Sequence, residues 1–260
     1  MKMFLRQTGA LVRLSFIELW RRNDIFAMFV LAVALMVPLS MASPFGAKGA
    51  SRYLDEAALL LVWAYSLFIS LGAGARLFPP EFESRTIYTL LAKPISRGAL
   101  LVGKFAGAVA ASWSALAFFY GMFAVASLMR GGFPYGADLI QAFVLHLAFC
   151  ALAVAVSLLV SLLVTPSANL TLSSILLVAM FFFGRRLPAY AETVSAPLSW
   201  LVRAAYAVAP HVEFFDMRQR VVHGWGGVDW TVFLAVIGYA VFYTAALLSL
   251  STLALRRKKL

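Results

Sequence analysis

Long apolar runs separated by short polar segments dominate the pattern of this chain. A bilayer core about 30 Å thick is crossed by about 20 apolar residues in a helix. Runs of roughly this length predict six membrane-spanning helices, at Ile25–Ala42, Ala57–Phe78, Leu100–Leu128, Leu139–Val164, Leu170–Phe183 and Trp230–Leu253. We therefore expect an all-α polytopic membrane protein, with residues 1–260 forming a single transmembrane domain.

The composition agrees with this pattern. Hydrophobic residues make up 63% of the chain and charged residues 13%, with a mean hydropathy of +0.88, whereas a soluble domain carries about 25% charged residues. The net charge of +11 could suggest nucleic acid as a partner. However, the basic residues lie in short segments between the apolar runs, which is typical of membrane anchoring and orientation. We expect the lipid bilayer, and no nucleic acid, as a partner.

The lysines and arginines are unevenly divided between the two sides that these spans define. Fourteen of the 22 fall on the side of both termini, and five of the other eight share one long loop. Because short cytoplasmic loops are enriched in Lys and Arg, both termini should be cytoplasmic, in a multi-pass protein of the cell (inner or plasma) membrane. In residues 1–24, the residues Lys2, Arg6 and Arg13 share one helical face. This indicates a helix lying in the cytoplasmic membrane surface, the alternative being a basic flank that only fixes topology.

Prolines isolate a short segment between the second and third spans, at residues 79–99. Pro79 and Pro80 are expected to end the second span, and Pro94 to stop a helix over Glu81–Leu91. The result is a short helix at the membrane face.

The same segment is dense in charge, in a chain that otherwise avoids it. Glu81 and Arg85 are four residues apart in the order that favours an ion pair on a helix, and Ser96 is a candidate N-cap for the third span. We expect these helix charges to be free to meet a soluble partner. A solvated loop with one helical turn is the alternative that the pattern leaves open.

The residues from Glu83 to Lys104 carry a family resemblance. The run Glu83-Ser-Arg-Thr86, then Leu90-Leu91, Pro94-Ile-Ser-Arg97 and Gly103-Lys104, resembles the signature of permeases of the type-2 ATP-binding-cassette transporter family. Members often have Gly before the Thr, where this chain has Arg85. The resemblance implies the permease subunit of an ATP-driven exporter, with two copies, expected to be a homodimer, around a central path.

In that family the helix between spans two and three is a coupling helix that docks on a separate ATPase subunit. The resemblance therefore implies an ABC-type ATPase as a partner, with docking through Glu81, Glu83, Arg85, Thr86, Tyr88, Leu90, Leu91, Pro94 and Arg97. No cofactor is expected on this chain, because the partner ATPase would bind ATP and Mg.

A long segment, residues 184–229, precedes the last span and should be external. Prolines punctuate it, and an apolar stretch at Ser199–Val208 predicts a helix dipping into the outer interface, with a second helix near Val212–Val222. In the resembling family this region caps the external end of the path. The candidate gate residues are Trp200, Arg203, Tyr206 and Pro210. A surface loop without a gating role is the alternative.

The segment Gly98–Lys104 matches most of a phosphate-binding P-loop. It ends in Phe105, where the motif needs Ser or Thr for magnesium, and no buried strand precedes it. We interpret it as the start of a span, so the chain should bind no nucleotide by itself. No catalytic residues are proposed, because no constellation typical of a nucleophile or a metallohydrolase is present.

Two polar groups could in principle bind a metal. His146 and Cys150 share a face of the fourth span, where a packed helix interface is the simpler interpretation. The external loop carries His211, Glu213, Asp216 and His223, where a solvated, arginine-paired surface is the simpler interpretation, so no metal site is expected. Gly103 and Gly107, spaced as in close helix pairs, are expected to be a packing site, as are Gly72 and Gly74.

Two other function classes remain as alternatives to a permease. One is a self-contained membrane enzyme, and the other is an ion-coupled secondary transporter. Both usually need ionisable groups at membrane depth, and the central parts of the predicted spans contain no Asp, Glu, Lys or Arg. The sequence does not identify the substrate.

Overall fold

The computed structural model describes residues 2–21, 23–41, 50–84, 96–129 and 136–257. Within these residues each predicted span is a helix: α2 (Asn23–Met41), α3 (Ala50–Ala75), α6 (Arg97–Met129), α7 (Ala137–Ser161), α8 (Pro166–Phe183) and α12 (Trp230–Arg257). Five of the described helical stretches are long and apolar enough to cross a membrane, while the apolar stretch of α2, Phe26–Pro38, is shorter. The prediction of an all-α polytopic membrane protein is confirmed.

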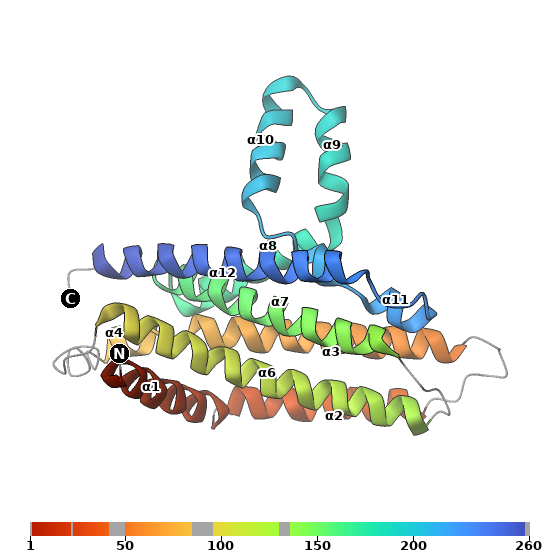
Figure 1. Cartoon of the computed structure of the whole chain (residues 1–260), viewed down its shortest axis with the longest axis horizontal. Helices are drawn as coiled ribbons and strands as arrows, with labels where there is room; N and C mark the ends of the chain where they lie inside the picture. The colour runs from red at the N-terminus through yellow and green to blue at the C-terminus, as the bar shows by residue number, and fades with distance from the viewer. Residues whose placement is uncertain (1, 22, 42–49, 85–95, 130–135, 258–260) are drawn as a thin grey trace.

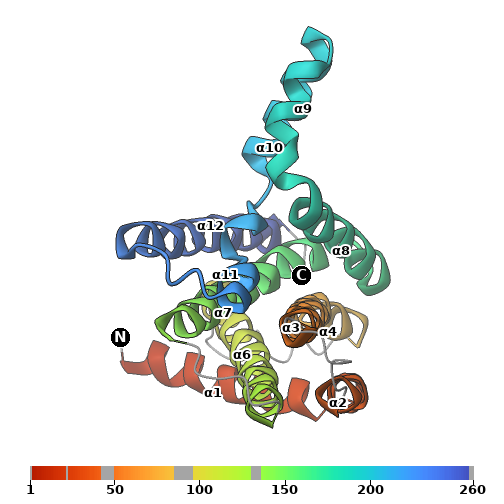
Figure 2. The ribbon, with the colours of Figure 1, turned by 90° about the vertical axis from the view of Figure 1, so that its right-hand side faces the viewer.

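The centre of the bundle lies between α3, α6 and α7 (Figure 2). Large aromatic rings fill it: Trp63 of α3 lies 4.1 Å from Phe149 of α7 and 4.6 Å from Phe181 of α8, measured between ring centroids. The helix α12 packs mainly on α7, whereas α8 contacts both α3 and α7. Many apolar side chains of α8 and α12 remain exposed, as expected where lipid is the solvent.

Both termini lie at one end of the bundle, together with the short helix α4 (Pro79–Glu83) (Figure 1). Helix α1 (Lys2–Trp20) packs along the first part of α6 at this end. Its buried residues Leu11, Ser15 and Leu19 recur every four positions and so share one face.

The contact between α1 and α6 depends on two glycines. A Cβ atom on Gly103 would lie 2.7 Å from Leu11 Cβ, and one on Gly107 would lie 2.7 Å from Ser15 Cβ. Only glycine permits so close an approach, which confirms the predicted packing site. Gly74 has the same role against Ser157 of α7, whereas a Cβ on Gly72 would meet nothing within 4 Å.

Beyond α8, the chain forms a helical hairpin. Helices α9 (Leu187–Thr193) and α10 (Ala196–Val208) follow the short 3-10 helix η1 (Gly184–Arg186) and project crosswise to the bundle helices (Figures 1 and 2). The apolar helix predicted at Ser199–Val208 lies within α10. The second predicted helix is divided into η2 (Val212–Phe215) and α11 (Arg218–His223), because Asp216 has an extended backbone.

Candidate functional site

The helix α4 starts at the proline pair, which the sequence analysis expected only to end the preceding span. Pro79 occupies the first helical position, where proline lacks only an N–H that would be unpaired anyway. Helix α3 ends earlier, at Ala75. Helix α4 is described to Glu83, with Ser84 as its C-cap. Of the predicted docking residues, six lie outside the described part of the chain: Arg85, Thr86, Tyr88, Leu90, Leu91 and Pro94.

The expectation that the charges of this helix are free is wrong for Glu81. Its Oε1 atom lies 2.6 Å from Nζ of Lys104 in α6, and the two side chains are 18% and 5% exposed. The reason is that Lys104 lies inside an apolar helix that packs against other helices. Such a buried charge requires a partner of opposite sign nearby.

Lys104 also has partners on the segment that leads into α4. Its Nζ donates a hydrogen bond of 2.7 Å to the Leu77 carbonyl oxygen. The ammonium group lies 5.3 Å from the ring centroid of Phe78, a cation–π contact. The ring of Phe78 in turn stacks with Phe82 at 6.0 Å. One lysine of α6 therefore contacts both the residues that lead into α4 and the middle of α4.

The other described docking candidates differ in exposure. Glu83 is exposed. The side chain of Arg97, at the start of α6, donates hydrogen bonds to the carbonyl oxygens of Leu255 and Arg256, at 3.1 and 3.2 Å. These carbonyls belong to the last turn of α12, where a cation is favourable. Ser96 caps α6 as predicted, since its Oγ accepts a hydrogen bond from the Ala99 N–H at 3.1 Å.

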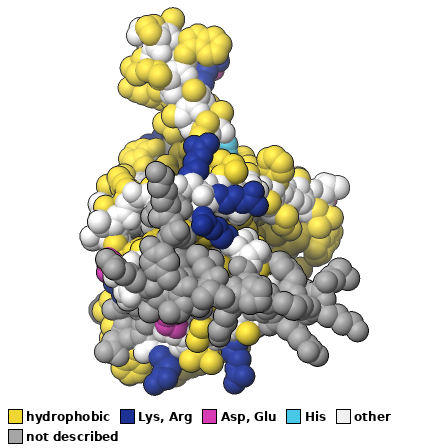
Figure 3. All heavy atoms as spheres, turned by 90° about the vertical axis from the view of Figure 1, so that its left-hand side faces the viewer, with side chains coloured by type: hydrophobic (Ala, Val, Ile, Leu, Met, Phe, Trp, Pro, Cys, Tyr) yellow, Lys and Arg dark blue, Asp and Glu magenta, His cyan; other side chains and the backbone are white. Residues whose placement is uncertain are grey.

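The end of the bundle that contains α4 is basic. Figure 3 views this end and shows more Lys and Arg side chains than Asp and Glu among the described residues. Exposed or half-exposed arginines here come from α1, the end of α3, the start of α6 and the end of α12: Arg13, Arg21, Arg76, Arg97, Arg256 and Arg257. The basic residues that the sequence places near the two termini therefore lie on this end of the bundle.

The gate candidates lie on or just after α10, which has no buried residue. Trp200 is 75% exposed, and Arg203 is also exposed. Tyr206 is half-buried, with its hydroxyl 3.4 Å from Glu213 Oε1, and Pro210 is buried. Burial, and then the Glu213 carboxylate, raise the pKa of Tyr206. Tyr206, near the base of the hairpin, thus connects it to Glu213 of η2.

The polar residues of the 184–229 segment do not converge on one point. His211 stacks on Phe214 and bonds Tyr239 of α12, with 3.1 Å between Nδ1 and the phenol oxygen. Asp216 pairs with Arg218 at 2.9 Å.

Glu213 is buried rather than solvated. Its carboxylate lies against Gly184, where a Cβ would come 2.6 Å from Oε2. No group of three metal-ligating side chains is found in the described residues.

His146 is part of a packed helix interface, as the simpler interpretation predicted. Its Nε2 atom lies 2.6 Å from Ser66 Oγ, its Nδ1 lies 3.3 Å from the Tyr120 hydroxyl, and its ring stacks on Trp63 at 5.1 Å. The neighbouring thiol of Cys150 is fully buried. These contacts join α3, α6 and α7.

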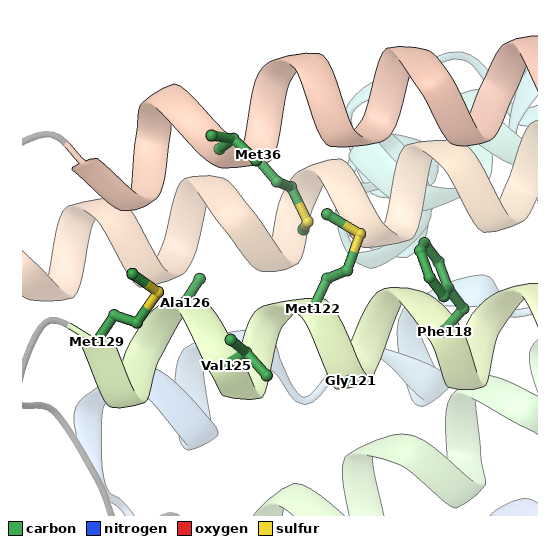
Figure 4. Close-up of a pocket in the computed structure, with 8 residues that line it drawn as sticks. Met36, Phe118, Gly121, Met122, Val125, Ala126 and Met129 are labelled. Atoms are coloured by element: carbon green, nitrogen blue, oxygen red, sulfur yellow. The ribbon is translucent and has the colours of Figure 1, made fainter.

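Among the hollows on the described surface, two lie between membrane-spanning helices and are almost entirely apolar. One, of about 440 Å³, lies between α2 and α6, and Figure 4 shows Met36 of α2 above Met122 of α6. The other, of about 660 Å³, lies between α6, α7 and α12. In the second, the indole N–H of Trp113 already donates to the Leu147 carbonyl at 2.8 Å. Neither hollow offers the convergent polar groups that catalysis needs.

Two polar contacts between elements far apart in the sequence were not predicted. The first is Glu81–Lys104. The sequence feature that could have indicated this ion pair is Lys104 itself, a single lysine within an apolar run. A lysine that is buried there requires a partner of opposite charge. The second is Gln141 of α7, which pairs with both backbone groups of Val228, at 2.7 and 3.0 Å, and so fixes the segment before α12. A buried amide has no sequence pattern that identifies its partner.

Comparison of the sequence with protein-family models gives a match over residues 21–260 to the model described as ABC-2 family transporter protein. The match begins directly after α1 and takes in all six spans and α4. No curated protein matches the chain.

Proposed function

The chain belongs to the ABC-2 family of transporter proteins, and from this premise we propose that it is the permease subunit of an ATP-driven exporter. The family agrees with the resemblance drawn from Glu83 to Lys104. The observation that carries the proposal is α4, a short helix fastened to α6 at the basic end of the bundle. That end is where a soluble ATPase would dock, with Glu83 as an exposed contact.

The helical conformation of the segment that resembles a P-loop supports a separate ATPase. Residues 98–104 are part of α6, so their backbone N–H groups lie in a helix rather than in a loop that could surround phosphates. The lysine of this segment, Lys104, already contacts Glu81 and Leu77. ATP would therefore be bound by the partner chain.

A second copy of the permease is supported by the packing of one copy. The space between α3, α6 and α7 is filled by aromatic rings, and the two apolar hollows open on the outside of the bundle. We infer that the path for substrate runs between two copies. The crosswise hairpin α9–α10, with Trp200, Arg203, Tyr206 and Pro210, would cap its outer end.

The basic end of the bundle supports cytoplasmic termini in the cell membrane, by the positive-inside rule. The alternatives have less support. A secondary transporter or membrane enzyme usually needs ionisable groups at membrane depth. In the described spans, Asp, Glu, Lys and Arg lie within the first or last three turns.

The test is affinity purification of the tagged chain from its native membranes, with mass spectrometry of the proteins that remain bound. We expect an ATPase with a complete P-loop, in near-stoichiometric amount. If docking buries Glu83 in a charge pair, losing that pair costs about 2–5 kcal/mol. Glu83→Lys should therefore weaken retention about tenfold or more.

The matched control is Glu192→Lys, an exposed charge reversal on α9, in the hairpin that projects from the bundle away from α4 (Figure 1). It should leave ATPase retention unchanged. Equal retention by Glu83→Lys and wild type would remove Glu83 from the docking surface. The absence of any P-loop protein from the wild-type preparation would contradict the proposed function.

A further inference from the structure

We propose that Glu81 and Lys104 form a joint that passes displacement of α4 to α6, so that the two acids of α4 have different roles. This inference rests on the proposed docking of an ATPase at α4. Glu83 would meet the ATPase, whereas Glu81 would hold α4 to the membrane helices. The joint is a positioning device and takes no part in binding ATP.

The first step of the argument is that α4 cannot hold its own place. It has five residues, and an isolated helix shorter than about 12 residues is marginal in water. Its position therefore depends on tertiary contacts. Among these, Lys104 contacts the segment at two levels, through the Leu77 carbonyl at 2.7 Å and the Glu81 carboxylate at 2.6 Å.

The second step concerns the kind of contact. Hydrophobic contacts are non-directional, so apolar surfaces can slide past one another while staying buried. An ion pair with side chains only 5% and 18% exposed behaves differently. Separating its members leaves two poorly solvated charges, which is costly. The pair therefore resists a change of distance between α4 and α6 more strongly than the apolar contacts around it.

The third step concerns how a displacement of α4 would be passed on through α6. Lys104 lies on α6 between Gly103 and Gly107, which contact Leu11 and Ser15 of α1. At this level α6 is therefore held by α4 through the ion pair and by α1 through backbone contact. Helix α6 is unbroken over its 33 residues, from Arg97 to Met129, so movement of its first turns reaches the opposite end of the bundle.

The experiment uses the complex of the permease with the ATPase that copurifies with it, reconstituted in liposomes. The measured quantity is coupling, defined as the difference in ATP turnover between the bound ATPase and the same ATPase alone. The variants are Glu81→Lys, Lys104→Glu, the charge swap that combines them, and an apolar pair, Glu81→Leu with Lys104→Met. Thermal unfolding and ATPase retention are recorded for each.

The apolar pair separates a joint from a merely stabilising contact. Replacing a buried ion pair by apolar side chains is often neutral or stabilising, so this variant should fold and retain the ATPase. We expect its coupling to fall at least fivefold. The single reversals should also lose coupling, and the swap should regain at least half of it, because it restores attraction between α4 and α6.

Coupling by the apolar pair at the wild-type level would overturn the inference, even with the ATPase bound as proposed. This variant decides the matter alone where the swap fails to fold. If the apolar pair no longer retained the ATPase, the inference would also be overturned. That result would mean that Glu81 or Lys104 binds the ATPase directly. A wild-type chain that retains no ATPase refutes the proposed function instead, so the two failures are distinguishable.

Discussion

Gly107 and Gly121 lie on the same helix, α6, but in different surroundings. A Cβ on Gly107 would come 2.7 Å from Ser15 Cβ and 2.8 Å from the Val12 carbonyl oxygen of α1, whereas a Cβ on Gly121 would meet nothing within 4 Å. The same substitution therefore has opposite expected effects at the two positions.

Gly107→Ala should destabilise the protein, because the methyl group meets the backbone of α1 and a forced repacking costs about 1–3 kcal/mol. Gly121→Ala should be neutral or slightly stabilising, since alanine is favoured over glycine within a helix by up to about 1 kcal/mol. Thermal unfolding of both variants in detergent measures the difference. Equal unfolding temperatures would show that α1 and α6 are not in close contact at Gly107.

At the scale of elements, α4 and the α9–α10 hairpin should lie on opposite sides of the membrane. Ser84, at the end of α4, and Thr193, at the end of α9, are both exposed. Cys150 is fully buried, so the native chain should give little background with a thiol reagent. Single cysteines at the two exposed positions can therefore be introduced without replacing it.

Intact cells treated with a membrane-impermeant thiol reagent should label Thr193→Cys strongly. Ser84→Cys should be labelled only after the membrane is permeabilised, because the basic end is expected to be cytoplasmic. Permeabilisation should therefore increase the labelling of Ser84→Cys strongly and leave that of Thr193→Cys unchanged. Labelling of Ser84→Cys from outside would invert the topology.

For the whole molecule, purified permease without its partner should hydrolyse no ATP. Residues 98–104 lie in α6, and Lys104 is committed to Glu81 and Leu77. Phosphate release by the pure chain measures this, with Lys104→Ala as the control for a contaminating enzyme. Turnover that persists in wild type, disappears in Lys104→Ala and occurs without a copurifying ATPase would overturn the assignment of nucleotide to another chain.

The sequence by itself determined the position and approximate extent of the long apolar helices. In lipid a helix satisfies its backbone polar groups internally, and about 20 apolar residues in a helix cross the bilayer core. The sequence also determined local features such as the N-cap at Ser96, since the partner is only three residues away. The family, too, could be recognised from short motifs around Glu83 to Lys104.

Only the tertiary structure decided which polar groups meet. Arg97 forms a hydrogen bond with Leu255 of α12, 158 residues away, and Gln141 forms one with Val228, 87 residues away. Lys104 forms an ion pair with Glu81, which is therefore not free to meet a partner protein. The direction of the α9–α10 hairpin was likewise not readable from its apolar pattern. The physical reason is that periodicity fixes which face of a helix is apolar, whereas the partner of a buried charge depends on which helices the fold brings within a few ångströms.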